Sequence, residues 1–191
     1  PEGVLSTAPA GTLIIDHSTI SPADSLKVYQ ACKEKGVGFI DAPVSGGVSG
    51  AKQGTLSIMA GGDRVDYARA LPLLRILGEN VTYLGPSGSG NVMKLVNNLL
   101  VGITNAALAE AFVLAGKSGL DPHTVFNILS KSTGDSQMLR RNLTNFVLKR
   151  NFQPAFTLDM LNKDMALAEE LALNQGVRLL LGALAHPIGR E

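Results

Sequence analysis

The 191-residue sequence has little of what marks secreted, nucleic-acid-binding or membrane proteins. Its one cysteine, Cys32, cannot form an internal disulfide, which is typical of a reducing compartment. Seventeen basic residues balance 16 acidic ones, so no excess charge indicates nucleic acid or an anionic membrane as a partner. No uninterrupted apolar run reaches the roughly 18 residues of a membrane span, because Lys94 and Asn97 break the longest candidate. We therefore expect a soluble, cytoplasmic protein that binds a small molecule.

What is present suits a folded protein with a substantial core. Hydrophobic residues make up 45% of the chain, enough for one large or two small domains. The sequence starts at Pro1, and residues 12–16 ("TLIID") already have the pattern of a strand inside a domain. We therefore expect the chain to be the later part of a longer protein whose beginning is missing.

The first half of the chain alternates short apolar runs with helical segments. Ser21 followed by Pro22 is a helix start signal, and a second helix is expected from Asp63. Strands are expected at 12–16, 38–43, 55–62 and 80–85. Strands of this length separated by helices predict an α/β sheet over residues 1–90.

After residue 90 the pattern becomes entirely helical. One long helix is expected over 91–118, and its many small residues permit close helix packing. Asp121 and Pro122 form a helix start of the N-cap-then-proline type. Further helices are expected at about 136–149, 157–175 and 177–186. The expected fold is thus an α/β part, residues 1–90, then a long interdomain helix and an all-α domain, residues 91–191.

The stretch "GPSGSGNVMKLVNN" (85–98) combines a glycine-rich turn with a lysine inside a helix. A Walker P-loop needs its lysine immediately after the last glycine, whereas Lys94 lies four positions beyond Gly90. A dinucleotide fingerprint needs GxGxxG after a first strand, and the spacing here is GxxGxG. Neither phosphate-binding interpretation fits.

The position of Lys94 leaves two interpretations open. Asn98 shares its helix face at i+4, and Asn97 lies slightly to one side at i+3. The positive end of a helix dipole tends to lower the pKa of an amine, which favours proton exchange near neutral pH. The alternative is an ordinary exposed lysine, which is common on protein surfaces.

Three further stretches could contribute to a site. Ser45, Gly46 and Gly47 offer a hydroxyl and unobstructed backbone N–H groups, a nest for a carboxylate or phosphate, or else a plain glycine turn. "DHSTISP" (16–22) places hydroxyls at a strand end, where α/β sheets bind ligands, although these residues could equally cap a helix. Lys163 and Asp164 lie on the rim of an amphipathic helix and, taken alone, form an ordinary charged face.

"DAPVSGG", "GSGNVMKLVNN" and "LNKDMALA", in this order and spacing, resemble the β-hydroxyacid dehydrogenase family, which includes 3-hydroxyisobutyrate dehydrogenases and tartronate semialdehyde reductases. The resemblance covers nearly the whole chain and includes "DHSTISP" and "SGLDPHTVFNIL". It implies the later part of a Rossmann-like domain followed by a helical domain. It also implies hydride transfer between NAD or NADP and a short 3-hydroxy acid or its semialdehyde.

The resemblance also implies roles for individual residues. Lys94 is expected to be the general acid and base, and Asn98 is expected to hold both substrate and lysine. The substrate carboxylate is expected at Ser45, Gly46 and Gly47, with Asn97 a further substrate-binding neighbour. Thr19 and Lys163 are expected cofactor contacts, and no metal is implied. A homo-oligomer, dimer or tetramer, is expected as well.

The sequence departs from the family pattern in one respect. Relatives begin with a strand–GxGxMG–helix unit that binds the cofactor pyrophosphate, and these 191 residues contain no such unit. NAD and NADP therefore cannot be told apart, and we expect this chain to be inactive by itself. Two rivals remain, a non-catalytic scaffold of the same fold and a dehydrogenase for a larger acid such as 6-phosphogluconate. Family-like scaffolds lack the lysine, and the second rival needs more cations than Lys52 near the clamp.

Overall fold

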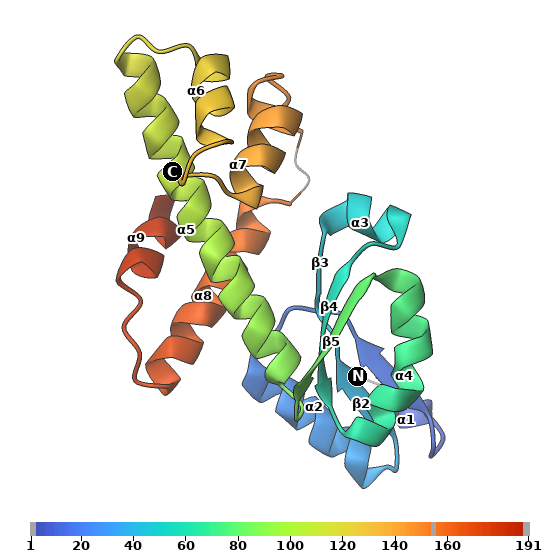
Figure 1. The fold of residues 1–191 in the computed structure, drawn as a ribbon. Coiled ribbons are helices and arrows are strands. Elements are labelled where there is room, and N and C mark those ends of the chain that lie inside the picture. The colour runs from blue at the N-terminus through green and yellow to red at the C-terminus, as the bar shows by residue number, and fades with distance from the viewer. Residues whose placement is uncertain (1–2, 154–155, 189–191) are drawn as a thin grey trace. The chain divides into compact units, whose positions relative to one another are not determined.

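The computed structural model describes residues 3–153 and 156–188 (Figure 1). It divides into two compact units, one made of residues 1–97 with 170–177 and the other of 98–169 with 178–191. The division falls inside the long helix α5 (Ser89–Lys117), and the described residues of the second unit form helices and loops without a strand. The domain boundary expected near residue 90 stays a prediction.

The first unit is built on one mixed five-stranded sheet. Its strands are β1 (Leu13–Asp16), β2 (Gly38–Asp41), β3 (Val44–Ser45), β4 (Ser57–Gly62) and β5 (Asn80–Gly85). The order is β1-β2-β4-β3, and β5 also pairs with β4. The pairs β1–β2 and β4–β5 are parallel, whereas β4 runs antiparallel to both β2 and β3. The expected α/β sheet is confirmed, with the expected strands at closely similar positions.

Two helices of this unit, α2 (Pro22–Glu34) and α4 (Arg64–Leu77), contribute to two separate apolar clusters. Successive residues of β2 point to opposite faces of the sheet, as the pleat requires. Phe39 accordingly packs with Cys32 of α2, and Ile40 packs in the cluster that holds Leu74 of α4. All four residues are 0–1% exposed, so the centres of both clusters are shielded from solvent. Burial raises the pKa of the Cys32 thiol above its ordinary value.

Three short elements of this unit were not expected from the sequence. They are α1 (Val4–Thr7), β3 and α3 (Gly47–Gln53). β3 is only two residues long, which is too short for an alternating pattern to predict it. It forms by pairing with β4. α3 starts directly after Gly46 in a glycine-rich stretch of low helix propensity. Tertiary contacts decide such elements.

The second unit consists of the rest of α5 and the helices that follow it. These are α6 (Pro122–Leu129), α7 (Gln137–Asn142), a π-helical turn (Leu143–Val147), α8 (Leu158–Asn174) and α9 (Leu180–Ile188), with the last turns of α8 assigned to the first unit. The helix expected at 136–149 is thus an α-helix continued by a π-helix. The all-helical character expected for this part is confirmed.

Helix α5 is apolar enough over part of its length to be a candidate membrane span, although polar residues interrupt it. Its most apolar 18-residue window has a mean hydropathy of 1.7, so by length and composition alone the helix could cross a membrane. Only 6% of that window is buried within the chain. By this measure the expectation of no candidate membrane span was wrong, because it counted uninterrupted apolar residues, whereas averaging over a window tolerates a single charge such as Glu110.

Asp121 caps α6 as the sequence predicts, because its carboxylate accepts a hydrogen bond of 2.8 Å from the Thr124 N–H. That N–H and the Thr124 hydroxyl lower the pKa of Asp121. A carboxyl whose pKa is lowered on folding stabilises the fold above its unfolded pKa, and the effect disappears as pH falls through the lowered folded value. We expect Asp121→Ala to unfold at a lower temperature than the wild type at pH 7.

The difference between wild type and Asp121→Ala should shrink in a series of thermal melts taken toward acidic pH. Asp121→Asn is the matched control because it keeps an acceptor oxygen without the charge. A difference that is the same at all pH values would contradict the capping role.

Candidate functional site

The glycine-rich turn before α5 lets the start of that helix lie directly against the sheet. Gly88 has φ of +92°, a conformation that favours glycine, and it leads into Ser89 and Gly90. A Cβ atom at Gly90 would lie 2.7 Å from the Asp41 carbonyl oxygen and 2.8 Å from its Oδ2. The glycines therefore serve close backbone packing rather than the cradling of a phosphate.

Lys94 and Asn98 lie one turn apart on α5, in agreement with the spacing of the sequence. Lys94 is half-buried and Asn97 is half-buried, whereas Asn98 is 3% exposed. The amide nitrogen of Asn98 donates a hydrogen bond of 2.5 Å to Oδ2 of Asp164. This bond fixes the amide, since its nitrogen faces the carboxylate and its oxygen must point away.

Asp164 is the residue that sequence reasoning misjudged. It was expected on the rim of an amphipathic helix, yet it is 2% exposed. The neighbouring Lys163 side chain is 52% exposed, and its Nζ lies 2.9 Å from Asp164 Oδ1, although the two atoms are not aligned for a hydrogen bond. The structure thus brings Asn98 and Lys163 together on one carboxylate.

A signal for Asp164 was present in the sequence. The buried residues of α8 recur at helical spacing, and Asp164 falls within their stripe, next to Leu161, Met165 and Ala168. A carboxylate on an apolar stripe requires a partner, because an unpaired buried charge is costly. The partner, Asn98, lies 66 residues away in the sequence and could not be named from the pattern.

The clamp residues lie where a short strand passes into a short helix. Ser45 ends β3 and is half-buried, while Gly46 and Gly47 are exposed. Gly46 has φ of +132° and Gly47 has φ of +63°, so both adopt backbone conformations that side chains disfavour. Glycine thus permits this turn between β3 and α3, and its role in binding a carboxylate stays a prediction.

Thr19 lies in the loop between β1 and α2, at the carboxyl end of the parallel pair β1–β2. Ligands of α/β sheets bind at such ends, so Thr19 fits a nucleotide contact, whereas the glycine unit for the pyrophosphate is not among these residues. Ser21 of the same loop caps α2 by accepting a hydrogen bond of 3.0 Å from Asp24 N–H. His17 is bonded through Nδ1 to the Ala42 carbonyl oxygen at 2.6 Å and makes no pair with Asp16.

A third group of polar residues, Asp41, Asn91 and Ser25, is fully buried in the first unit. Burial raises the pKa of the Asp41 carboxyl, although hydrogen bonds from the Gly88 and Asn91 N–H groups and from Ser87 oppose this effect. None of these three side chains was expected from the sequence to contribute to a site.

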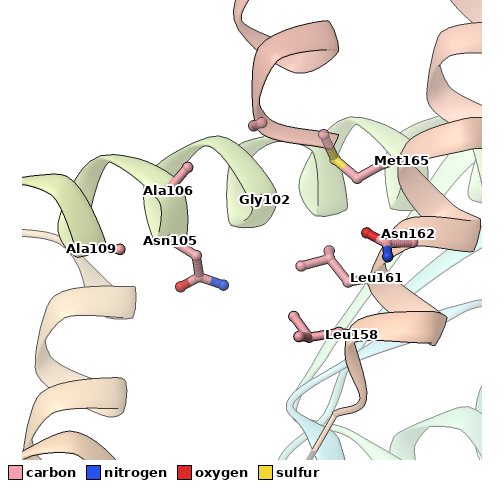
Figure 2. A pocket seen from close by; sticks show the side chains of 9 residues that line it. Gly102, Asn105, Ala106, Ala109, Leu158, Leu161, Asn162 and Met165 are labelled. Carbon is pink, nitrogen blue, oxygen red and sulfur yellow. The ribbon is translucent and has the colours of Figure 1, made fainter. Parts of the chain in front are cut away.

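A cavity of about 190 Å³ lies in the helical unit, between α5, α8 and α9 (Figure 2). Figure 2 shows Leu158 and Leu161 of α8 facing Asn105 of α5. The lining is mainly apolar and contains none of the sequence-predicted site residues. The cavity is therefore not a candidate for the chemistry of Lys94.

No metal centre accompanies these residues. Within 3–153 and 156–188, the side chains of His, Cys, Asp and Glu form no group of three or more that could hold an ion.

Two protein-family profiles together match most of the chain. The profile described as the NAD-binding domain of 6-phosphogluconate dehydrogenase matches residues 1–85. The profile described as NAD-binding of NADP-dependent 3-hydroxyisobutyrate dehydrogenase matches residues 88–190.

Individual proteins agree with these profiles. The chain is 41% identical to 2-(hydroxymethyl)glutarate dehydrogenase of Eubacterium barkeri, over 98% of this chain and 62% of the relative. It is 40% identical to 3-hydroxyisobutyrate dehydrogenase of Pseudomonas aeruginosa, over 97% of this chain and 64% of the relative. Its structure is similar to that of Mycobacterium tuberculosis 3-hydroxyisobutyrate dehydrogenase with L-serine, with a TM-score of 0.89, 35% identity, and coverage of 98% and 66%. The chain spans less than two thirds of the length of each.

Proposed function

Because the chain belongs to the β-hydroxyacid dehydrogenase family, we propose that the whole protein transfers a hydride between NAD or NADP and a short 3-hydroxy acid or its semialdehyde. The observation that carries this proposal is the arrangement on α5, where Lys94 precedes by one turn an Asn98 whose amide is fixed by buried Asp164. An orienting amide beside an amine suits proton transfer at a hydroxyl group.

Lys94 is the proposed acid and base of the reaction. As a neutral amine it accepts the proton of the substrate hydroxyl, and as an ammonium it returns a proton to the alkoxide in the reverse direction. When bound, the nicotinamide accepts or supplies the hydride. Asn98 orients the reacting oxygen of the substrate relative to the Lys94 amine. Asn97 is proposed as a neighbouring substrate contact.

The substrate carboxylate is proposed to bind at Ser45, Gly46 and Gly47. The Ser45 hydroxyl and the N–H groups of two glycines can donate to its oxygens, and the absence of glycine side chains leaves the approach open. This contact holds the reacting carbon by geometry, because a fixed carboxylate limits where the hydroxyl can lie. Thr19 and Lys163 are the proposed contacts of the cofactor.

The match of residues 1–85 to a 6-phosphogluconate dehydrogenase profile favours one alternative substrate class, a larger phosphorylated acid. A phosphate needs several cations, and Lys52 is the one basic residue between Ser45 and Gly62. We therefore favour a short acid without phosphate.

An assay of the full-length protein tests the proposed function. Both NAD and NADP are offered with 3-hydroxyisobutyrate, 2-(hydroxymethyl)glutarate, L-serine and 6-phosphogluconate, and reduction of the dinucleotide is followed. We expect turnover with at least one short 3-hydroxy acid and none with 6-phosphogluconate. No reduction of either dinucleotide by any short acid would contradict the proposal. We expect no turnover from the 191 residues alone, since they contain no pyrophosphate-binding glycine unit.

We also propose that the protein is a soluble, cytoplasmic homo-oligomer, a dimer or tetramer. The apolar surface of α5 is the reason, because Val113 is 62% exposed and Leu114 is 70% exposed. On α9, Leu181 and Leu184 are likewise 64% and 69% exposed. Apolar surface of this kind needs cover, and a second copy supplies cover of matching chemistry.

Leu114→Glu should reduce the association of the full-length protein, because it places a charge on this apolar surface. Val65→Glu is the matched control, since Val65 of α4 is 74% exposed but lies outside α5 and α9. Sedimentation equilibrium measures both. A monomeric wild type, or equal association of both variants, would contradict the proposal.

A further inference from the structure

The start of α5 is held by a buried polar cluster that connects three segments of the first unit. Asp41 ends β2, Asn91 lies in the first turn of α5, and Ser25 belongs to α2. All three residues are 0% exposed. Fully buried polar side chains are costly unless each is hydrogen-bonded, so their contacts decide what the cluster does.

Asp41 occupies the N-terminal end of the helix. Its Oδ1 accepts hydrogen bonds from the Gly88 N–H at 2.8 Å and from the Ser87 hydroxyl at 3.2 Å. Its Oδ2 accepts from the Asn91 N–H at 3.2 Å. The two N–H groups are donors that a helix start leaves without intrahelical partners, and a carboxylate there also complements the helix dipole. The group that accepts hydrogen bonds at this glycine-rich turn is thus the protein's own Asp41 side chain.

Asn91 connects this anchored turn to the loop of Thr19. Its Oδ1 accepts a hydrogen bond of 3.1 Å from the Ile20 N–H, and its Nδ2 donates one of 2.8 Å to the Ser25 hydroxyl. Both ends of the amide are therefore engaged, so the side chain has one orientation. The backbone next to Thr19 is bonded to the helical turn that precedes Lys94.

We propose that Asn91 is a positioning residue that sets the loop of the cofactor contact Thr19 relative to the turn carrying Lys94, with Asp41 anchoring that turn. This inference rests on the proposed function, in which Thr19 and Lys94 serve cofactor and proton transfer. Both must be held within about 0.5 Å for hydride and proton to move together. A displacement of about 1 Å can reduce a reaction rate about 100-fold.

The amide is suited to this task because it is bonded to groups from two other elements. Ile20 follows β1, and Ser25 lies in α2, so a shift of α5 would break bonds to both. A residue that served stability alone could be replaced at a cost in folding but with no effect on the reaction of the molecules that remain folded. That difference separates a positioning role from a structural one.

Single-turnover kinetics of the full-length protein measure this difference. With enzyme in excess over a limiting amount of NAD or NADP and saturating 3-hydroxyisobutyrate, the rate constant reports hydride transfer in folded molecules. The amplitude is set by the limiting dinucleotide, so the fraction of folded molecules is measured separately by circular dichroism. Asn91→Ala should lower the rate constant about 10- to 100-fold. Leu74→Ala, at a 0% exposed core position of the same unit without polar contacts, should lower only the fraction of folded molecules.

Ser25→Ala provides a second, milder variant in case Asn91→Ala does not fold. It removes the partner of the Asn91 amide nitrogen and leaves the Ile20 bond, so we expect a smaller decrease of the rate constant in the same direction. Rate constants equal to that of the wild type in the folded Asn91 and Ser25 variants would overturn the positioning role. Lys94→Ala is measured alongside, and an unchanged rate constant in that variant would remove the proposed function itself.

Discussion

Lys94→Ala in the full-length protein is expected to lower turnover about 10²- to 10⁴-fold, the range that general acid–base catalysis contributes. The reason is that alanine cannot accept the hydroxyl proton or return one to the alkoxide. The Michaelis constant for the dinucleotide should change little, because the proposed cofactor contacts, Thr19 and Lys163, remain. Steady-state kinetics with a 3-hydroxy acid and either dinucleotide measure both quantities.

Two further lysine variants sharpen this test. Lys94→Arg keeps a positive charge, but a guanidinium does not lose its proton in proteins, so it cannot act as a base and turnover should stay low. Lys117→Ala removes the same residue type from the last turn of the same helix and should leave turnover unchanged. Activity close to that of the wild type in Lys94→Ala would remove the lysine from the proposed chemistry.

Gly90→Ala is expected to destabilise the protein by about 3 kcal/mol or more, the upper range for overpacking a core. The new Cβ atom would overlap the Met59 carbonyl oxygen and come within 2.8 Å of Asp41 Oδ2. Both atoms belong to rigid parts of the sheet, one of them backbone, so the helix start would have to move. Since native domains are stable by only about 5–15 kcal/mol, much of the protein should be unfolded or poorly expressed.

Gly116→Ala is the matched control in the same helix, because no atom lies within 4 Å of a Cβ at that position. Alanine is the better helix former, so Gly116→Ala should stabilise by about 0.5–1 kcal/mol. Chemical denaturation of the two variants gives both values. Equal stabilities would show that the close approach at Gly90 does not matter.

The sheet and its helices could be predicted because their signals are local. Short apolar runs mark β1, β4 and β5, and Ser21 and Asp121 cap helices that follow them within three residues. The spacing of Lys94 and Asn98 also follows from helix periodicity alone. β3 and α3 escaped because they are short and form only where β4 offers a partner or the glycines permit a turn.

The sequence by itself determined the order of elements, the helix caps, the family and the one-turn spacing of an amine and an amide on α5. Only the tertiary structure decided that the Asp41 carboxylate accepts hydrogen bonds from the glycine-rich turn and that Asp164 is buried against Asn98. The partners of these carboxylates lie 47 and 66 residues away in the chain. Periodicity and capping depend on neighbours within a few residues, whereas the pairing of a buried charge depends on which distant segments the fold brings into contact.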